Sequence, residues 1–267
     1  MPELIRHQIS PLGVARVTLN RADRRNALTR AMIEELTSCL QKLAAHAQVR
    51  LIILTAEGSV FCAGMDLAEM QQRAADEASQ VEWLQDSLVY RDLLTTLLET
   101  PQVTLAALPG PVLAGGVGLV LGCDLVVASE TTFFSLPEPQ RGITAAMVTP
   151  LLVYRAGVNT ASQLLLSGRR MSAAEAHGQG LCQQVVAAEQ LESTVDDWSR
   201  SILSGARSAL AATKTQFRQT VGQALSAQLE KAAELSAAAR ATPEAREGLQ
   251  AFLDKRKPGW QTYGEPN

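Results

Sequence analysis

Two short runs of small residues, FCAGMDL at 61–67 and AGGVG at 114–118, could do chemistry through their main chain. Each run follows an apolar segment typical of a buried strand and leads into a segment typical of a helix. The first N–H groups of a helix have no partner within it, and the positive end of the helix dipole lies behind them. Two such groups directed at one point would form an oxyanion hole, which stabilises charge that develops on a carbonyl oxygen. Glu138, in the sequence LPE, is the candidate acid or base beside that oxygen.

The segments around these runs alternate between strands and helices. Apolar runs predict strands at 4–10, 14–20, 51–54, 103–108 and 125–128. Helical spacing of apolar residues predicts helices at 31–47, 81–98 and 116–121. The recurrence of strand, loop and helix indicates an α/β fold with right-handed crossovers.

Beyond residue 147 the pattern becomes helical. Helices are predicted at 147–156, 161–166, 173–179, 188–204, 206–220, 224–241 and 243–254, with one short strand at 185–186. We therefore expect an α/β core at 1–190 that carries the site and a helical region at 191–267. The alanine runs of this region reflect high helix propensity, and it is expected to pack on the core or on another subunit.

The composition is that of a soluble globular protein. Hydrophobic residues make up 46% of the chain and charged residues 19%, which argues against extensive disorder. A net charge of −3 gives no reason to expect a nucleic acid as partner. The four cysteines lack metal-ligand spacing, so we expect reduced thiols, no bound metal and a cytoplasmic location. No apolar run is long enough to span a membrane, and no membrane association is expected.

Further motifs follow one another along nearly the whole chain. They are NRxxxxNAL at 20–28, FCAGMDL at 61–67, GxxLAGG at 110–116, FxxPE at 134–138, GxxMSAxEA at 168–176 and EGxxAFLxKR at 247–256. Each motif is weak by itself, but in this order and spacing they make the chain resemble the enoyl-CoA hydratase/isomerase (crotonase) superfamily.

That resemblance implies a spiral of β-β-α repeats with a helical C-terminal trimerisation region, and hence a homotrimer or a dimer of trimers. The substrate would be an acyl-CoA thioester, and no separate cofactor is expected because coenzyme A is part of the substrate. The N–H groups of Met65 and Gly115 would hold the thioester oxygen, and Glu138 would be the catalytic acid/base.

The resemblance also assigns residues to substrate binding. Those that would line the path of coenzyme A are Arg25, Ala27 and Leu28. Those that would contact its adenine and pantetheine parts are Ala63, Asp66 and Leu67. Phe252 and Lys255, near the end of the chain, would close the coenzyme A site, in the same subunit or a neighbouring one.

The chain departs from the family pattern at Gly118, where many family hydratases carry a second carboxylate. Glu138 alone can still move protons, because partial burial raises the pKa of a carboxyl group toward neutrality. Gly118 has two readings that the sequence leaves open. It is either a gap beside the acyl chain, which would admit a bulkier or anionic acyl group, or a glycine that lets two helices approach closely.

The strings GGVGLV at 115–120 and AMVTP at 146–150 are similar to the bacterial methylglutaconyl-CoA hydratase branch, which includes isohexenylglutaconyl-CoA hydratases. A substrate of this kind carries a free carboxylate that needs a cation. Arg141 is the nearest basic candidate, and a surface or structural arginine is the alternative.

The sequence thus predicts an enoyl-CoA hydratase that adds water across the C2–C3 double bond of a branched enoyl-CoA. Within the family the alternative is an enoyl-CoA isomerase that uses Glu138 as a proton shuttle, followed by decarboxylases and thioesterases. A dinucleotide-binding loop is disfavoured because the glycines at 116, 118 and 122 have the wrong spacing. A non-enzymatic helical scaffold is the remaining class.

Overall fold

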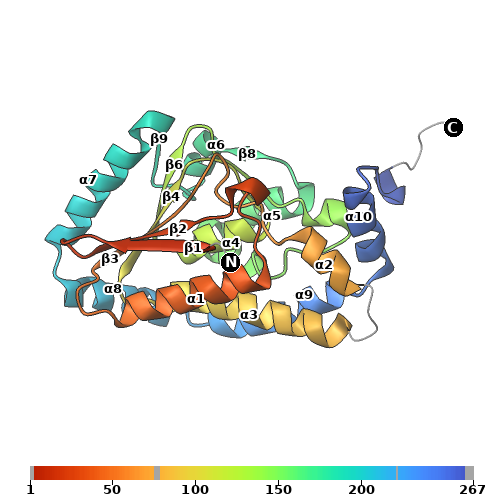
Figure 1. Cartoon of the computed structure of the whole chain (residues 1–267), viewed down its shortest axis with the longest axis horizontal. Helices are drawn as coiled ribbons and strands as arrows, with labels where there is room; N and C mark the ends of the chain where they lie inside the picture. Colours follow the sequence, from red (N-terminus) through yellow and green to blue (C-terminus); the bar gives the residue numbers. More distant parts are fainter. Residues whose placement is uncertain (1–2, 75–78, 221, 262–267) are drawn as a thin grey trace.

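A six-stranded sheet lies at the centre of the computed structural model, which describes residues 3–74, 79–220 and 222–261 (Figure 1). The strands, in spatial order, are β1 (Ile5–Ile9), β2 (Val14–Leu19), β3 (Leu51–Ala56), β4 (Val103–Leu108), β6 (Leu125–Ser129) and β9 (Gln184–Val186). Only the β1–β2 pair is antiparallel within this sheet; the other neighbours pair in parallel. The predicted strands at 51–54, 103–108 and 125–128 are therefore confirmed at its centre.

A second, three-stranded sheet combines β5 (Val112–Leu113), β7 (Phe133–Ser135) and β8 (Met171–Ser172). The chain passes from β4 through β5 into helix α4 (Gly115–Gly122), and from β6 through β7 into helix α5 (Thr149–Ser167). Each passage is a β-β-α unit with one strand in each sheet, so the predicted repeat is present. The strands of the second sheet are too short for a periodic signal, and the sequence did not predict them.

Helices cover both faces of the larger sheet. Ile52 and Leu54 of β3 belong to the core that contains α1 (Arg30–Ala45), α3 (Ser79–Glu99) and α4. Leu51 and Ile53 face the opposite way and pack with α7 (Leu191–Ser204), beside which lies α8 (Arg207–Thr220). Burial on both faces explains why the central strands read as continuous apolar runs.

The predicted helices at 147–156 and 161–166 form one element, α5, which bends at Gly157. This glycine has φ 76° and ψ 169°, outside the helical region. Its positive φ, which glycine adopts without steric cost, lets the two helical segments follow each other directly.

The C-terminal helices pack on the core of the same chain. Helix α9 (Leu225–Arg240) lies along α3, and its residues Leu229 and Ala233 are buried in the shared core (Figure 1). Helix α10 (Pro243–Leu253) contacts α2 (Leu67–Ala74) and the short helix η2 (Glu138–Arg141). None of the helices in the described ranges combines the length and hydropathy of a membrane span.

Close approach of main chains fixes helix α4. A Cβ atom added at Gly116 would lie 2.7 Å from Cβ and 2.8 Å from the carbonyl oxygen of Cys62. Gly122 is packed in the same way, with the position of its missing Cβ 3.1 Å from Cβ of Leu97 on α3. The glycines of α4 therefore let it sit directly on the 61–67 turn and on α3.

Gly116→Ala is expected to lower the free energy of unfolding by about 1–3 kcal/mol, because the new methyl group overlaps main-chain atoms that cannot move aside. Gly178→Ala is the matched control, since no atom lies within 4 Å of a Cβ atom at this position in α6 (Ala173–Gly178). Urea unfolding measures both variants. Equal effects of the two substitutions would contradict the packing argument.

Candidate active site

The two glycine runs lie side by side. Cys62 forms a parallel bridge with Val112, and the Leu113 N–H donates to the Cys62 carbonyl oxygen at 2.9 Å. A Cβ atom at Gly64, which has φ 86°, would lie 2.5 Å from Cβ of Ala114 and 3.1 Å from the nitrogen of Gly115. The absence of side chains at these positions brings the turn at 61–67 against the first turn of α4.

Two main-chain N–H groups are available where the turns meet. Among the described residues, the N–H groups of Met65 and Gly115 have no hydrogen-bond partner. Ala114, just before α4, has φ 50° and ψ −128°, a conformation that costs a residue with a side chain on the order of 1–3 kcal/mol. Met65 and Gly115 both line one cavity of about 420 Å³. The pair can act as the predicted oxyanion hole.

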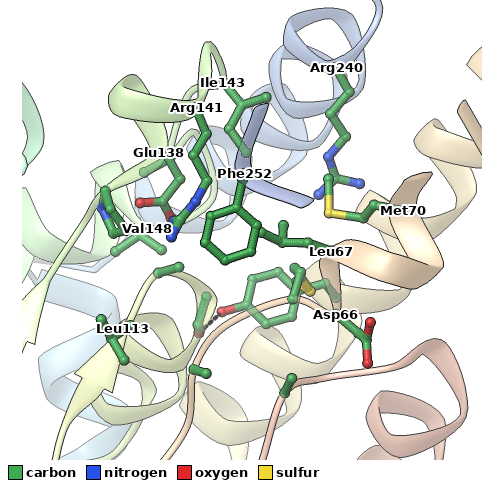
Figure 2. Close-up of a pocket in the computed structure, with 18 of the residues that line it drawn as sticks. Asp66, Leu67, Met70, Leu113, Glu138, Arg141, Ile143, Val148, Arg240 and Phe252 are labelled. Carbon is green, nitrogen blue, oxygen red and sulfur yellow. Dashed lines mark hydrogen bonds between the residues drawn. The ribbon is translucent and has the colours of Figure 1, made fainter. Parts of the chain in front are cut away.

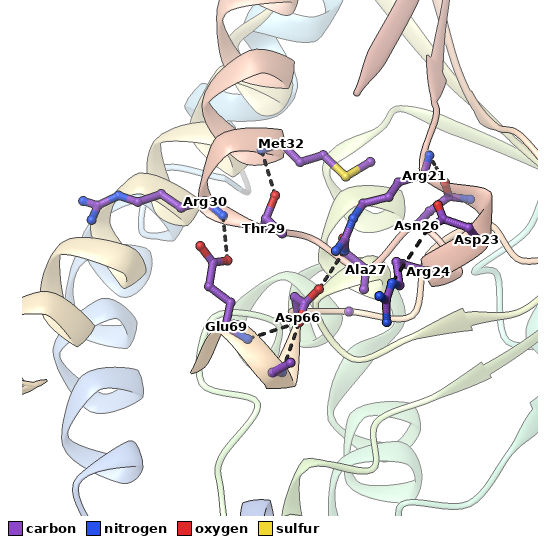
Figure 3. Close-up of polar contacts among 12 residues, drawn as sticks. Arg21, Asp23, Arg24, Asn26, Ala27, Thr29, Arg30, Met32, Asp66 and Glu69 are labelled. Atoms are coloured by element: carbon purple, nitrogen blue, oxygen red, sulfur yellow. Dashed lines mark hydrogen bonds and ion pairs between the residues drawn. The ribbon is translucent and has the colours of Figure 1, made fainter. Parts of the chain in front are cut away.

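The loop at 20–28 supports the first turn through polar contacts (Figure 3). The buried side chain of Asn26 donates to the carbonyl oxygens of Glu57 at 3.0 Å and Val60 at 2.8 Å. Arg21 donates to the Asp66 carboxylate at 2.7 Å. Arg25 and Asn26 both adopt positive φ, 54° and 51°, which places Arg25 at the cavity wall.

Asp66 holds local structure together at the edge of the cavity. Its carboxylate accepts hydrogen bonds from Arg21 and from the N–H groups of Ala68 and Glu69, at the start of α2. Leu28 also supports the turn: its N–H donates to Gly64 at 2.8 Å and its carbonyl oxygen accepts from Asp66 at 2.9 Å. The Leu28 side chain lies in the core.

Glu138 begins helix η2, which α10 holds in place. A Cβ atom added at Gly248 of α10 would overlap the carbonyl of Arg141, and one added at Gly142 would overlap the carbonyl of Glu244. The two elements therefore touch backbone to backbone. This contact fixes the end of η2 that carries Arg141, and both Glu138 and Arg141 line the cavity.

Glu138 is 7% exposed and lines the cavity. Burial raises its pKa from about 4.5 to about 7, although its own backbone N–H and the charge of Arg141 act to lower it. Its Oε2 atom has no hydrogen-bond partner within the described residues. A carboxyl group with this pKa can both accept and return a proton near neutral pH.

Arg141 lies next to Glu138 and faces Phe252 of α10 (Figure 2). The guanidinium carbon is 4.5 Å from the centre of the Phe252 ring, a cation–π contact. The Arg141 Nε atom is buried without a hydrogen-bond partner in the described part of the chain. The cavity thus contains a cation with an unused donor.

Most residues predicted to form the site share this cavity. They are Arg25, Ala27, Ala63, Met65, Asp66, Leu67, Gly115, Glu138, Arg141 and Phe252. Three predicted residues do not line it: Leu28 and Gly118 face the core, and Lys255 is exposed beyond the end of α10. Tyr90 of α3 also lines the cavity, and no local motif in the sequence marks it as a site residue.

The expected gap at Gly118 is filled. A Cβ atom at this position would overlap the hydroxyl oxygen of Tyr90 and lie 3.4 Å from Cδ2 of Leu94. Gly118 is therefore the glycine of a close helix contact, the second of the two readings, and the first reading, a gap beside the acyl chain, is excluded. The physical reason is that a side chain from α3, distant in sequence, occupies the space.

The geometry as a whole suits a class of enzyme that polarises a carbonyl group with main-chain donors and moves a proton with one carboxyl group. Comparison with known proteins makes this class specific. The family model described as enoyl-CoA hydratase/isomerase matches residues 10–263. The chain belongs to this family, and its mixed α/β structure is the crotonase fold.

Individual relatives agree with this assignment. The "Enoyl-CoA isomerase/hydratase fer4" of Mycosarcoma maydis is 32% identical over 259 residues, covering 92% of each chain. The mouse "Enoyl-CoA hydratase domain-containing protein 3, mitochondrial" is 32% identical over 93% of this chain and 81% of its own length. A crystal structure of an enoyl-CoA hydratase from Mycobacterium avium has a TM-score of 0.85 at 30% identity, covering 97% of this chain and all of that one.

Glu138→Gln should make stability less dependent on pH. The native carboxyl group keeps its proton up to about pH 7, whereas the unfolded chain loses it near 4.5, so wild-type stability falls as the pH rises between these values. At pH 8 the variant should gain roughly 3 kcal/mol over the wild type compared with pH 4. Urea unfolding at both pH values measures the difference. A constant difference would contradict the buried, protonated carboxyl group.

Proposed function

We propose that this protein is an enoyl-CoA hydratase that adds water across the C2–C3 double bond of a branched enoyl-CoA of the methylglutaconyl-CoA or isohexenylglutaconyl-CoA type. The observation that carries the proposal is the shared cavity of Glu138 and the two unpartnered N–H groups of Met65 and Gly115. Family membership supports an acyl-CoA thioester as substrate.

In the proposed mechanism the Glu138 carboxylate takes a proton from water while the water oxygen bonds to C3. The electron pair of the double bond moves toward the thioester and forms an enolate. The N–H groups of Met65 and Gly115 stabilise the charge on the enolate oxygen. Protonated Glu138 then returns its proton to C2, and the thioester carbonyl re-forms. This cycle needs no metal and no redox cofactor.

The substrate class rests on Arg141 and on the apolar wall around it. Figure 2 shows Ile143, Val148 and Leu113 around the same cavity, side chains that suit a branched hydrocarbon chain. Arg141 has a buried donor without a partner, and leaving such a group unpaired costs free energy. A carboxylate on the acyl chain would pair with it in a charge-assisted hydrogen bond.

An enoyl-CoA isomerase is the second candidate. Glu138 could move a proton from C4 to C2 without a second carboxylate, and the carboxylate of Asp66 is already engaged by Arg21. The related protein of Mycosarcoma maydis carries both activities in its name. Assays of hydration and double-bond migration with the same enoyl-CoA distinguish the two reactions.

We also propose a homotrimer or dimer of trimers located in the cytoplasm. The support is the apolar surface of the C-terminal region, where Phe217 of α8 is 59% exposed and Leu235 of α9 is 61% exposed. Contact with another subunit would remove these side chains from water.

Glu138→Gln should lower kcat for hydration at least ~100-fold, because the amide cannot take the proton of the attacking water. The kcat values of the variant and the wild type are measured in discontinuous assays of crotonyl-CoA and methylglutaconyl-CoA hydration. Glu99→Gln, at the exposed end of α3, is the matched control and should retain full activity. Hydration at the wild-type rate by the Glu138 variant would remove this residue from the mechanism.

Arg141→Leu should lower kcat/KM about tenfold more for methylglutaconyl-CoA than for crotonyl-CoA, since only the former carries a carboxylate for Arg141 to bind. Arg25→Leu, at the same cavity wall, should affect both substrates alike because they share coenzyme A. The ratio of the two kcat/KM values is the measurement. An unchanged ratio in the Arg141 variant would exclude its role in acyl recognition.

A further inference from the structure

Tyr90 is a buried polar side chain of the cavity that the mechanism above leaves unused. It lies in the middle of α3, is 2% exposed, and lines the cavity together with Met65, Gly115 and Glu138. Its hydroxyl group donates a hydrogen bond to the carbonyl oxygen of Gly115. This contact joins α3 to the first turn of α4, where the Gly115 N–H group has no partner among the described residues.

The Tyr90 hydroxyl group occupies the place where a side chain at position 118 would begin. A Cβ atom built on Gly118 would overlap the hydroxyl oxygen and lie 3.3 Å from Cζ of the ring. A Cβ atom built on Gly115 would lie 3.5 Å from the same oxygen. A tyrosine at 90 and a long side chain at 118 therefore exclude each other in this fold.

The hydrogen-bond capacity of Tyr90 decides what it can do toward the cavity. A phenol has one proton to donate and lone pairs that accept. The proton is committed to Gly115, so the oxygen can only accept from a molecule in the cavity. Burial first, then the neighbouring Cys62 and Glu138, raise the pKa of Tyr90 well above 10, which keeps the phenol neutral.

Tyr90 and Glu138 line the same cavity, and the charge of Glu138 acts on Tyr90. A water molecule that bridges them would find an acceptor on each side. One of its protons would bond to the phenol oxygen and the other to the carboxylate that removes it. This arrangement would direct the oxygen lone pair of the water toward C3 and leave one carboxylate beside the water instead of two. A single negative charge also repels an anionic acyl chain less than two charges would.

We propose that Tyr90 is a second catalytic residue of the hydration reaction, which holds the attacking water as a neutral acceptor in place of a side chain at position 118. The inference rests on the proposed hydratase function. In the reaction Tyr90 gains and loses no proton: the proton of the water goes to Glu138 and then to C2, as the carbon–oxygen bond forms at C3.

The test compares two reactions, one that uses the attacking water and one that uses only Glu138 and the oxyanion hole. Exchange of the C2 proton of butyryl-CoA in D2O needs Glu138 and the oxyanion hole but no attacking water, because a saturated chain cannot be hydrated. Tyr90→Phe should lower kcat for hydration of methylglutaconyl-CoA and crotonyl-CoA about tenfold, the effect of one lost hydrogen bond. Exchange with butyryl-CoA should stay within about twofold of the wild type.

Two further variants sharpen the result. Tyr154→Phe, in α5 outside the cavity, removes a phenol hydroxyl of the same kind and should change neither reaction. Tyr90→Ala with Gly118→Glu opens the space and supplies a carboxylate, so hydration should exceed that of Tyr90→Ala alone.

Unchanged hydration in Tyr90→Phe would overturn the assignment. An equal fall in hydration and exchange would also overturn it, since Tyr90 would then act through the position of Gly115 or through the fold. A wild-type enzyme that exchanges the C2 proton but hydrates neither enoyl-CoA would refute the proposed function itself, and the role of Tyr90 with it.

Discussion

The contact between two main-chain turns governs this structure. Gly64 and Gly116 leave no room for side chains where the 61–67 turn meets α4, and Ala114 accepts a strained conformation at the same point. The contact sets two N–H groups beside each other without using any side chain. Main-chain donors held by two sheets and a helix need little rearrangement when charge develops on a bound oxygen, which is the basis of electrostatic preorganisation.

Much of the scaffold could be predicted from the sequence, because its signals are local. The strands β3, β4 and β6 are continuous apolar runs, and α4 follows its turn motif directly. The short strands β5, β7 and β8 have two or three residues each and show no period. Their position depends on pairing with distant segments, which no local pattern reports.

The site residues likewise fall into those that a local sequence motif marks and those that no local motif marks. Met65, Gly115 and Glu138 belong to sequence motifs and were placed in one cavity as expected. The sequence could not identify Tyr90 as a site residue, because a tyrosine within a helix gives the same local pattern whether it packs in the core or lines a cavity. The gap reading of Gly118 is excluded because Tyr90, a residue distant in sequence, fills the volume beside this glycine. No local pattern around position 118 reports which side chain of another helix fills that volume.

The backbone contact between η2 and α10 connects the helix that carries Glu138 and Arg141 to a helix near the C-terminus. Arg141 and Gly142 touch Gly248 and Glu244, more than a hundred positions later in the sequence. The strands β1 to β4 pair with one another within the first 108 residues. The end of η2 that carries Arg141 gains this contact only after α10 has been synthesised. A chain cut before α10 would therefore lose the support that holds Arg141 at the wall of the cavity.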